Sequence, residues 1–164
     1  MQVRPATPAD GAALAALYNP HILHGTATFE EEAVSAREMA DRAARTQAAG
    51  YDWLVAEEGG VLLGYAYSGR WMARSAYRHT VEVSVYVADA AQGRGVGRTL
   101  YAALFERLRA GDYHSVIGII TLPNPASIRL HEAFGMTQVA HYREVGRKFG
   151  RWIDVGQWQG RLNR

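Results

Sequence analysis

Three glycines follow an apolar run and precede a helical pattern, in the stretch Gln92-Gly93-Arg94-Gly95-Val96-Gly97-Arg98. Glycine lacks a Cβ atom, so the backbone can come close to a ligand at these positions. The first turn of the following helix adds free N–H groups and the positive end of the helix dipole. Such an arrangement binds anions, and a pyrophosphate fits it. A tight turn without a ligand is the competing interpretation of the same loop.

Two better-known phosphate-binding loops do not account for this motif. A dinucleotide-binding loop would need an acidic residue at the end of the next strand, where Ile119-Ile120-Thr121 stands instead. A Walker loop is excluded because the chain contains no Gly-Lys-Ser/Thr sequence.

Glu82 lies in the middle of a run rich in β-branched residues, Thr80-Val81-Glu82-Val83-Ser84-Val85. A carboxylate in such a strand costs free energy unless it is solvated, paired or used in chemistry. It is either the solvent-facing residue of an alternating strand or a general base whose pKa is raised by burial. The residues alone do not choose between these two interpretations.

Other polar residues are weaker candidates for chemistry. His131 is either a structural helix histidine or a group that orients or relays a proton, and it ranks below Glu82. Arg74 is either a surface residue or a bidentate partner for the α-carboxylate of a substrate. His21 and His24 have no third metal ligand at a suitable spacing, so we reject a metal site.

The elements that would position these residues follow from hydrophobic periodicity and cap signals. The patterns predict helices over residues 7–19, 35–48, 97–110 and 125–134. The first helix should end at Asn19-Pro20, and Ser35 with Glu38 forms a capping box for the second. Strands are predicted over residues 1–4, 51–57, 61–68, 80–87, 115–122, 137–145 and 153–159.

This order of elements predicts an α+β (mixed α/β) fold, in which helices pack on a mixed sheet. Residues 80–122 form a strand–helix–strand unit, which should be parallel and right-handed. A chain of 164 residues without a linker or repeat predicts a single domain over residues 1–164.

Composition narrows the function classes. The net charge of +2, with scattered basic residues, argues against a nucleic-acid partner. The chain has no cysteine, so disulfides, thiolate metal sites and a cysteine nucleophile are excluded. No secretory signal and no apolar run of membrane-spanning length is present, so we expect a cytoplasmic protein without a membrane partner.

The glycine motif also carries a family resemblance. With Val85-Tyr86-Val87 before it, the motif resembles the Q/R-x-x-G-x-G/A acetyl-CoA signature of GNAT acetyltransferases. The block from Leu122 to Met136 is similar to the region that closes over the pantetheine arm in that superfamily. Shorter matches resemble the phosphinothricin and methionine sulfoximine acetyltransferase branch: Tyr18-Asn19-Pro20, Thr28-Phe29-Glu30-Glu31, Thr80-Val81-Glu82 and Lys148-Phe149-Gly150-Arg151-Trp152.

The resemblance implies a mostly antiparallel sheet that is splayed at the acetyl-CoA site by a bulge in the Glu82 strand, with helices on its faces. It implies acetyl transfer from acetyl-CoA to the α-amine of a small amino-acid analogue, with Glu82 as general base and His131 as second catalytic candidate. The implied acetyl-CoA contacts are Val85, Tyr86, Val87, Gly93, Arg94, Gly95, Val96, Gly97, Arg98, Asn124 and Ser127.

The resemblance implies further that Phe29, Glu30, Arg74 and Tyr77 contact the substrate, that no metal takes part, and that the chain forms a homodimer. The chain departs from many relatives at Met136 and Arg147, both near the substrate end of the fold. Other acceptors remain open, namely polyamines, aminoglycosides and protein N-termini. A non-catalytic acyl-CoA-binding sensor, which would not need Glu82, is the alternative of a different class.

Overall fold

A seven-stranded sheet in the order β1-β2-β3-β4-β5-β7-β6 forms the centre of the protein, seen in a computed structural model that describes residues 1–162. Its strands are Gln2–Pro5 (β1), Trp53–Glu58 (β2), Val61–Arg70 (β3), Thr80–Val87 (β4), Ser115–Thr121 (β5), Thr137–Lys148 (β6) and Arg151–Arg161 (β7). The helices are Gly11–His24 (α1), Ala36–Ala48 (α2), Val96–Ala110 (α3) and Pro125–Ala133 (α4). Within residues 1–162, β4 and β5 form the one parallel pair.

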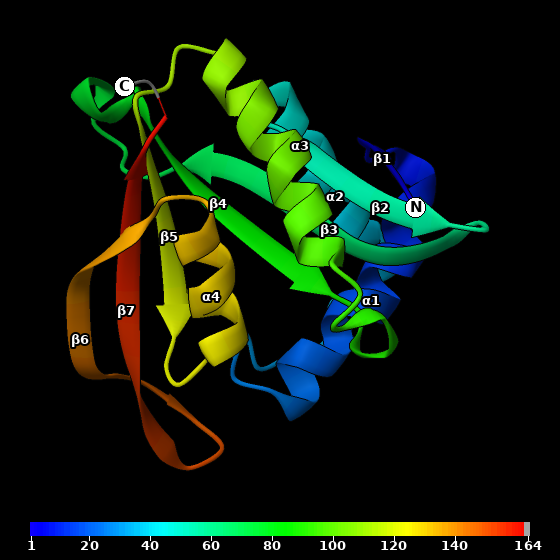
Figure 1. Cartoon of the computed structure of the whole chain (residues 1–164). Coiled ribbons are helices and arrows are strands. Elements are labelled where there is room, and N and C mark those ends of the chain that lie inside the picture. The colour runs from blue at the N-terminus through cyan, green and yellow to red at the C-terminus, as the bar shows by residue number, and fades with distance from the viewer. Residues whose placement is uncertain (163–164) are drawn as a thin grey trace.

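The helices cover both faces of this sheet and create two hydrophobic cores (Figure 1). On one face, α3 buries Leu100, Leu104 and Leu108 against the sheet. On the other face, α1 and α2 bury a smaller core, which includes Leu14 and Met39. The α+β class and the order of all eleven predicted helices and strands are confirmed, as is the parallel strand–helix–strand unit.

The predicted end of the first helix is wrong, because α1 continues through Pro20 to His24. Proline removes one backbone donor but does not by itself end a helix that packing holds together. Ile22 is 1% exposed in the core beneath α1, and its burial favours one more turn. The Asn19 side chain also anchors the helix, since it accepts from the N–H of Val34 and donates to the carbonyl of the same residue.

The sheet is splayed between β4 and β5 (Figure 1). These strands pair from Thr80 with Ser115 to Val83 with Gly118, and the pairing between them then ends. The expected bulge in β4 is wrong, because β3 and β4 pair without a register shift from Gly64 with Val87 to Arg70 with Val81. The gap therefore arises where β5 turns away to stay paired with β7, whose contact continues to Thr121.

An ion-pair network holds β1 to the start of α1. Arg4 binds Asp10 through two hydrogen bonds of 2.8 and 2.9 Å, and Asp10 also accepts from the Thr7 N–H at 2.7 Å. The pKa of Asp10 lies below its ordinary value, mainly because its carboxylate accepts hydrogen bonds from the Arg4 guanidinium. We expect Asp10→Asn to reduce the free energy of unfolding by about 2 kcal/mol, the usual contribution of hydrogen bonds to a charged group.

Urea unfolding at several pH values tests this expectation. A carboxylate with a lowered folded pKa stabilises the fold above its unfolded pKa of about 3.9, and loses that effect as the pH falls through the folded value. The difference between wild type and Asp10→Asn should therefore shrink towards acid. The control is Asp41→Asn at an exposed pair 4.0 Å from Arg37, where we expect no change. A difference that does not depend on pH would contradict the role of Asp10.

Candidate active site

The gap between β4 and β5 opens into a cavity of about 530 Å³. Strands β4 and β5 form its walls, the loop before α3 forms one end, and α4 closes another side. Of the predicted site residues, it is lined by Val85, Tyr86, Val87, Gly93, Gly95, Val96, Gly97, Arg98, Asn124, Ser127 and His131. The structure thus brings the segment of residues 85–98 together with residues 124–131, which follow it after α3 and β5.

The backbone of β4 presents free hydrogen-bonding groups to this cavity. The Ala88 N–H donates to the Leu63 carbonyl at 2.9 Å, which fixes the residues of β4 that bond to β3. Because this pattern alternates along an antiparallel pair, Val85 and Val87 direct their N–H and C=O groups away from β3 and into the gap. Of these groups, the Val87 carbonyl is already bound by His21 Nε2 at 3.0 Å. An extended ligand can pair with this edge as an additional strand would.

The glycine loop has a backbone conformation that favours glycine. Gly93 and Gly95 have φ angles of 75° and 78°, in the left-handed region that glycine adopts without strain. Gly95 is the residue directly before α3, so the first N–H groups of a 15-residue helix face the loop. Arg94 lies outside the set of lining residues, because its guanidinium binds Glu58 at 2.6 Å.

His131 lies on α4 with only 3% of its surface exposed. Its Nδ1 atom is 2.7 Å from the Ser127 carbonyl, and its Nε2 atom is 3.0 Å from the Tyr101 hydroxyl. A carbonyl can only accept, so Nδ1 carries the hydrogen, and neutral Nε2 accepts from Tyr101. Burial lowers the pKa of His131, which favours this neutral form. A Cβ atom at Gly118 would overlap the imidazole, so this glycine is required for the arrangement.

Glu82 occupies the part of β4 that still pairs with β5, opposite Ile117. It is half-buried, and burial raises the pKa of its carboxyl group above the ordinary value. The next two residues, Val83 and Ser84, line the cavity where the gap begins. Glu82 therefore lies beside the point at which a ligand along β4 would meet the intact sheet.

The predicted substrate residues lie outside this cavity. Arg74 and Tyr77 are exposed in the segment between β3 and β4, where Tyr77 packs edge-on against Trp71 at 5.2 Å. Phe29 lies over Gly146 of β6, where a Cβ atom would overlap its ring. Glu30 is bound to Arg42 at 2.7 and 2.9 Å and to the Tyr18 hydroxyl, and it lines a second, smaller cavity.

Comparisons with known proteins agree with this geometry. Residues 3–156 match the model of the acetyltransferase (GNAT) domain. The chain is 45% identical to a phosphinothricin N-acetyltransferase of Streptomyces viridochromogenes, over 97% of this chain and 86% of that protein. It is 40% identical to an L-methionine sulfoximine/L-methionine sulfone acetyltransferase of Salmonella typhimurium, over 99% of this chain and 95% of that protein. The chain belongs to the GNAT acetyltransferase family.

Solved structures of GNAT proteins place the cofactor in the same fold. The yncA protein of Salmonella typhimurium, solved with acetyl-CoA, has a TM-score of 0.95 at 40% identity and covers 99% of this chain and 94% of its own. A phosphinothricin acetyltransferase of Sinorhizobium meliloti in complex with acetyl-CoA has a TM-score of 0.94 at 36% identity, with coverage of 98% and 88%. The present chain is accordingly an acetyl-CoA-dependent N-acetyltransferase.

The cavity of this GNAT chain fits acetyl-CoA. The free edge of β4 suits the amide-bearing pantetheine arm, and the loop before α3 suits the pyrophosphate. At the opposite wall, Asn124 Oδ1 accepts from the Ser127 N–H at 3.2 Å and caps α4, which leaves the Asn124 amide N–H groups as donors. Among residues 1–162, no cluster of three His, Asp or Glu side chains is arranged for a metal ion.

Sequence reasoning missed several residues of the GNAT cavity, and two of them, Tyr101 and His21, make hydrogen bonds at its wall. Tyr101 belongs to the leucine-rich face of α3 and was indistinguishable from a core residue until its hydroxyl was seen next to His131. His21 was considered only as a metal ligand. In the structure its Nε2 atom is 3.0 Å from the Val87 carbonyl, and it lines the cavity. Its position depends on α1 continuing past Pro20.

Proposed function

We propose that this chain acetylates the α-amine of a small amino-acid analogue of the methionine sulfone, methionine sulfoximine or phosphinothricin type. The observation that carries the proposal is a half-buried carboxylate, Glu82, at the point where the acetyl-CoA cavity meets the intact sheet. The names of the relatives at 40–46% identity support the substrate class.

Glu82 is the proposed general base. An α-ammonium group must lose a proton before its nitrogen can attack, and Glu82 takes this proton directly or through one water molecule. Acetyl-CoA supplies the activated acetyl group. The raised pKa of Glu82 brings its basicity closer to that of the amine than an exposed glutamate would have.

The backbone of β4 and Tyr101 are proposed to stabilise the reacting groups. The N–H groups that β4 directs into the gap can bind the thioester oxygen, on which negative charge develops. The Tyr101 side chain lines the same cavity. Its hydroxyl can turn from His131 Nε2 to donate its proton to the departing sulfur. His131 holds this hydroxyl in place, so we assign it a positioning role.

Arg74 is proposed to bind the α-carboxylate of the substrate. Its exposed side chain lies in the segment directly before β4, close in sequence to Glu82. We expect Arg74→Ala to raise KM for amino acids by about tenfold or more, because a charged hydrogen bond is lost, with little change in kcat. Initial rates with methionine sulfone measure this, and Arg78→Ala in the same exposed segment is the control. An unchanged KM would contradict the assignment.

A thiol-release assay with a panel of amines tests the proposed function. The panel contains methionine sulfone, methionine sulfoximine, phosphinothricin, spermidine and a peptide amine. We expect turnover with the three amino acids alone. Turnover with spermidine or the peptide instead would refute the substrate class, and binding of acetyl-CoA without any turnover would favour the sensor. The structure does not favour a polyamine site, since Glu30 is already bound to Arg42.

The chain is further proposed to act as a homodimer in the cytoplasm. Strand β6 is an edge of the sheet, and large apolar side chains on the β6–β7 hairpin are exposed: Val139, Tyr142, Val145, Phe149 and Trp152. Exposed apolar side chains gathered on one edge are typical of a protein interface. Among the described helices, none has the length and apolar character needed to cross a membrane. Sedimentation of the purified protein would establish the oligomeric state.

A further inference from the structure

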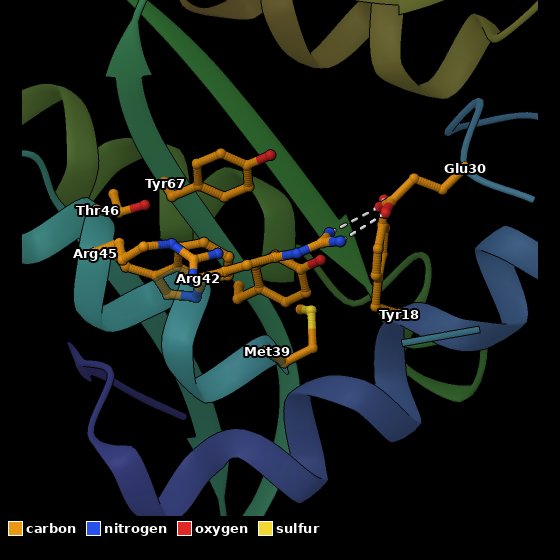
Figure 2. Close-up of a pocket in the computed structure, with 9 residues that line it drawn as sticks. Tyr18, Glu30, Met39, Arg42, Arg45, Thr46 and Tyr67 are labelled. Carbon is orange, nitrogen blue, oxygen red and sulfur yellow. Dashed lines mark hydrogen bonds and ion pairs between the residues drawn. The ribbon is translucent and has the colours of Figure 1, made fainter. Parts of the chain in front are cut away.

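The segment between α1 and α2, residues 25–31, lines both cavities, and we name it the strap. Ala27 lines the acetyl-CoA cavity, and Glu30 lines the smaller cavity of about 240 Å³. In the smaller cavity, the Glu30 carboxylate lies between the Arg42 guanidinium, to which it is bound, and the Tyr18 ring (Figure 2). A change in the position of the strap would therefore alter the shape of both cavities.

A buried amine from the far edge of the sheet holds the middle of the strap. Lys148, the one lysine of the sequence, lies at the end of β6 with 2% of its surface exposed. Its Nζ atom donates to the Thr28 carbonyl at 2.8 Å. Next to Thr28, the strap carries Phe29 and Glu30, two of the substrate contacts that the family resemblance implies. We propose that Lys148 is a positioning residue, which holds the strap where the acceptor amine meets the acetyl thioester; this inference rests on the proposed function.

The strap joins the two parts of the sheet that separate beyond the last paired residues of β4 and β5. On the side of β5, β6 and β7, the Thr121 hydroxyl donates to the Thr26 carbonyl, and Lys148 donates to the Thr28 carbonyl. On the other side, the Thr28 hydroxyl lies 2.8 Å from the hydroxyl of Tyr18, which belongs to the core between α1 and the sheet. The strap thus bridges the gap, and its contacts fix how an acceptor can approach an acetyl group bound along β4.

A lysine suits this contact better than the arginines that make up the rest of the 18 basic residues. An ammonium group is compact, whereas a guanidinium is broad and has five N–H donors that need acceptors when buried. Burial lowers the pKa of Lys148, and the nearby charges of Glu31 and Glu30 oppose this effect. The backbone of Lys148 pairs with Arg151 of β7, so strand pairing does not depend on the amine. Loss of the amine should therefore release the strap and leave β6 in place.

Steady-state kinetics of Lys148→Met tests this inference, because methionine keeps the apolar stem and removes the donor. We expect kcat/KM for methionine sulfone to fall by about tenfold or more, mainly through KM, since the acceptor is less well positioned. Acetyl-CoA affinity should change little, because β4 and the glycine loop remain. The matched control is Arg151→Met, which removes an exposed cation from the same hairpin and should leave KM unchanged. An unchanged KM in Lys148→Met would overturn the inference.

Chemical restoration of the amine separates positioning from packing. The chain has no cysteine, so Lys148→Cys introduces a single thiol, which can be alkylated in urea before refolding. Treatment with 2-bromoethylamine gives a side chain of lysine length that ends in an amine, and iodoethane gives the same chain without the nitrogen. We expect the aminoethyl protein to recover most of the wild-type kcat/KM and the ethyl protein to stay as impaired as Lys148→Met. Equal activity of the two alkylated proteins would show that the amine has no positioning role.

Hydrogen exchange separates this inference from the proposed function. In Lys148→Met, strap amides such as that of Glu30, which donates to the Thr28 hydroxyl at 3.2 Å, should exchange about tenfold faster or more, and those of β2 and β3 should not change. If wild type acetylates methionine sulfone but strap exchange is unchanged, or exchange rises throughout the variant, the positioning role is overturned and the proposed function stands. If exchange rises in the strap alone and wild type acetylates no amino acid, the strap contact stands and the proposed function fails.

Discussion

Glu82→Gln is expected to lower kcat by about 10²–10⁴-fold, the usual contribution of a positioned general base. Glutamine keeps the size and hydrogen-bonding capacity of the side chain, but it cannot accept the proton of the ammonium group. Binding of acetyl-CoA should not change, because the cavity is formed by the residues that follow Glu82 on β4 and by α3 and α4. Initial rates and acetyl-CoA titration measure the two effects separately.

The pH dependence gives a second signature of Glu82. In wild type, kcat/KM should fall on the acid side as the carboxylate becomes protonated, at a pH above that of an exposed glutamate. The acid limb should be absent in Glu82→Gln. Because burial raises the folded pKa of Glu82 above its unfolded value, the carboxyl group disfavours the folded state increasingly as the pH rises from the unfolded pKa to the folded pKa, and fully above the latter. The variant should therefore be at least as stable as wild type at pH 7. A fully active variant would contradict the assignment of Glu82 as general base, and an unfolded variant would contradict the expected stability.

Tyr101→Phe should lower kcat by about 10²-fold, since a proton donor to the departing sulfur is removed. The ring remains to fill the core beside Phe105 and Phe134, so the fold should be preserved. His131→Gln should lower kcat less, because it disturbs the position of the Tyr101 hydroxyl but keeps the hydroxyl itself. Single-turnover rates compare the three proteins at the chemical step.

The nature of the leaving group tests the role of Tyr101. An acetyl selenoester analogue of acetyl-CoA releases a selenolate, which departs without a proton. We expect this analogue to restore most of the rate in Tyr101→Phe and to leave the defect of Glu82→Gln unchanged. A defect of equal size with both acetyl donors would show that the hydroxyl serves packing or binding, and not proton donation.

The cofactor side of the site could be predicted because its determinants are local in sequence. Strand β4, the glycine loop and the start of α3 are consecutive, and Gly93 and Gly95 permit the left-handed conformation that the loop adopts. The Ser35 cap of α2 was predicted for the same reason, and its hydroxyl accepts from the Glu38 N–H at 3.0 Å. In both cases, residues close together in the sequence were sufficient to predict the feature.

The features that could not be predicted depend on contacts between distant segments. Tyr101 and His131 are 30 residues apart, and nothing in either helix pattern indicates their hydrogen bond. The smaller cavity combines residues from α1, α2, β2 and β3, and its aromatic residues Trp53, Tyr65 and Tyr67 appear in the sequence as ordinary core residues. We expected a bulge in β4 to separate it from β5, but the two strands separate because β5 stays paired with β7. Such features require the tertiary arrangement.

The most direct test of α-amine acetylation by this protein is to identify the product. The purified protein is incubated with acetyl-CoA and methionine sulfone, and the amino acid is analysed by mass spectrometry and by NMR of the α-proton. We predict one acetyl group on the α-nitrogen, in an amount equal to the thiol released, and at least about 100-fold less product from Glu82→Gln in the same time. Thiol release without an acetylated amine, or acetylation at another atom, would contradict the assignment of this site to α-amine acetylation.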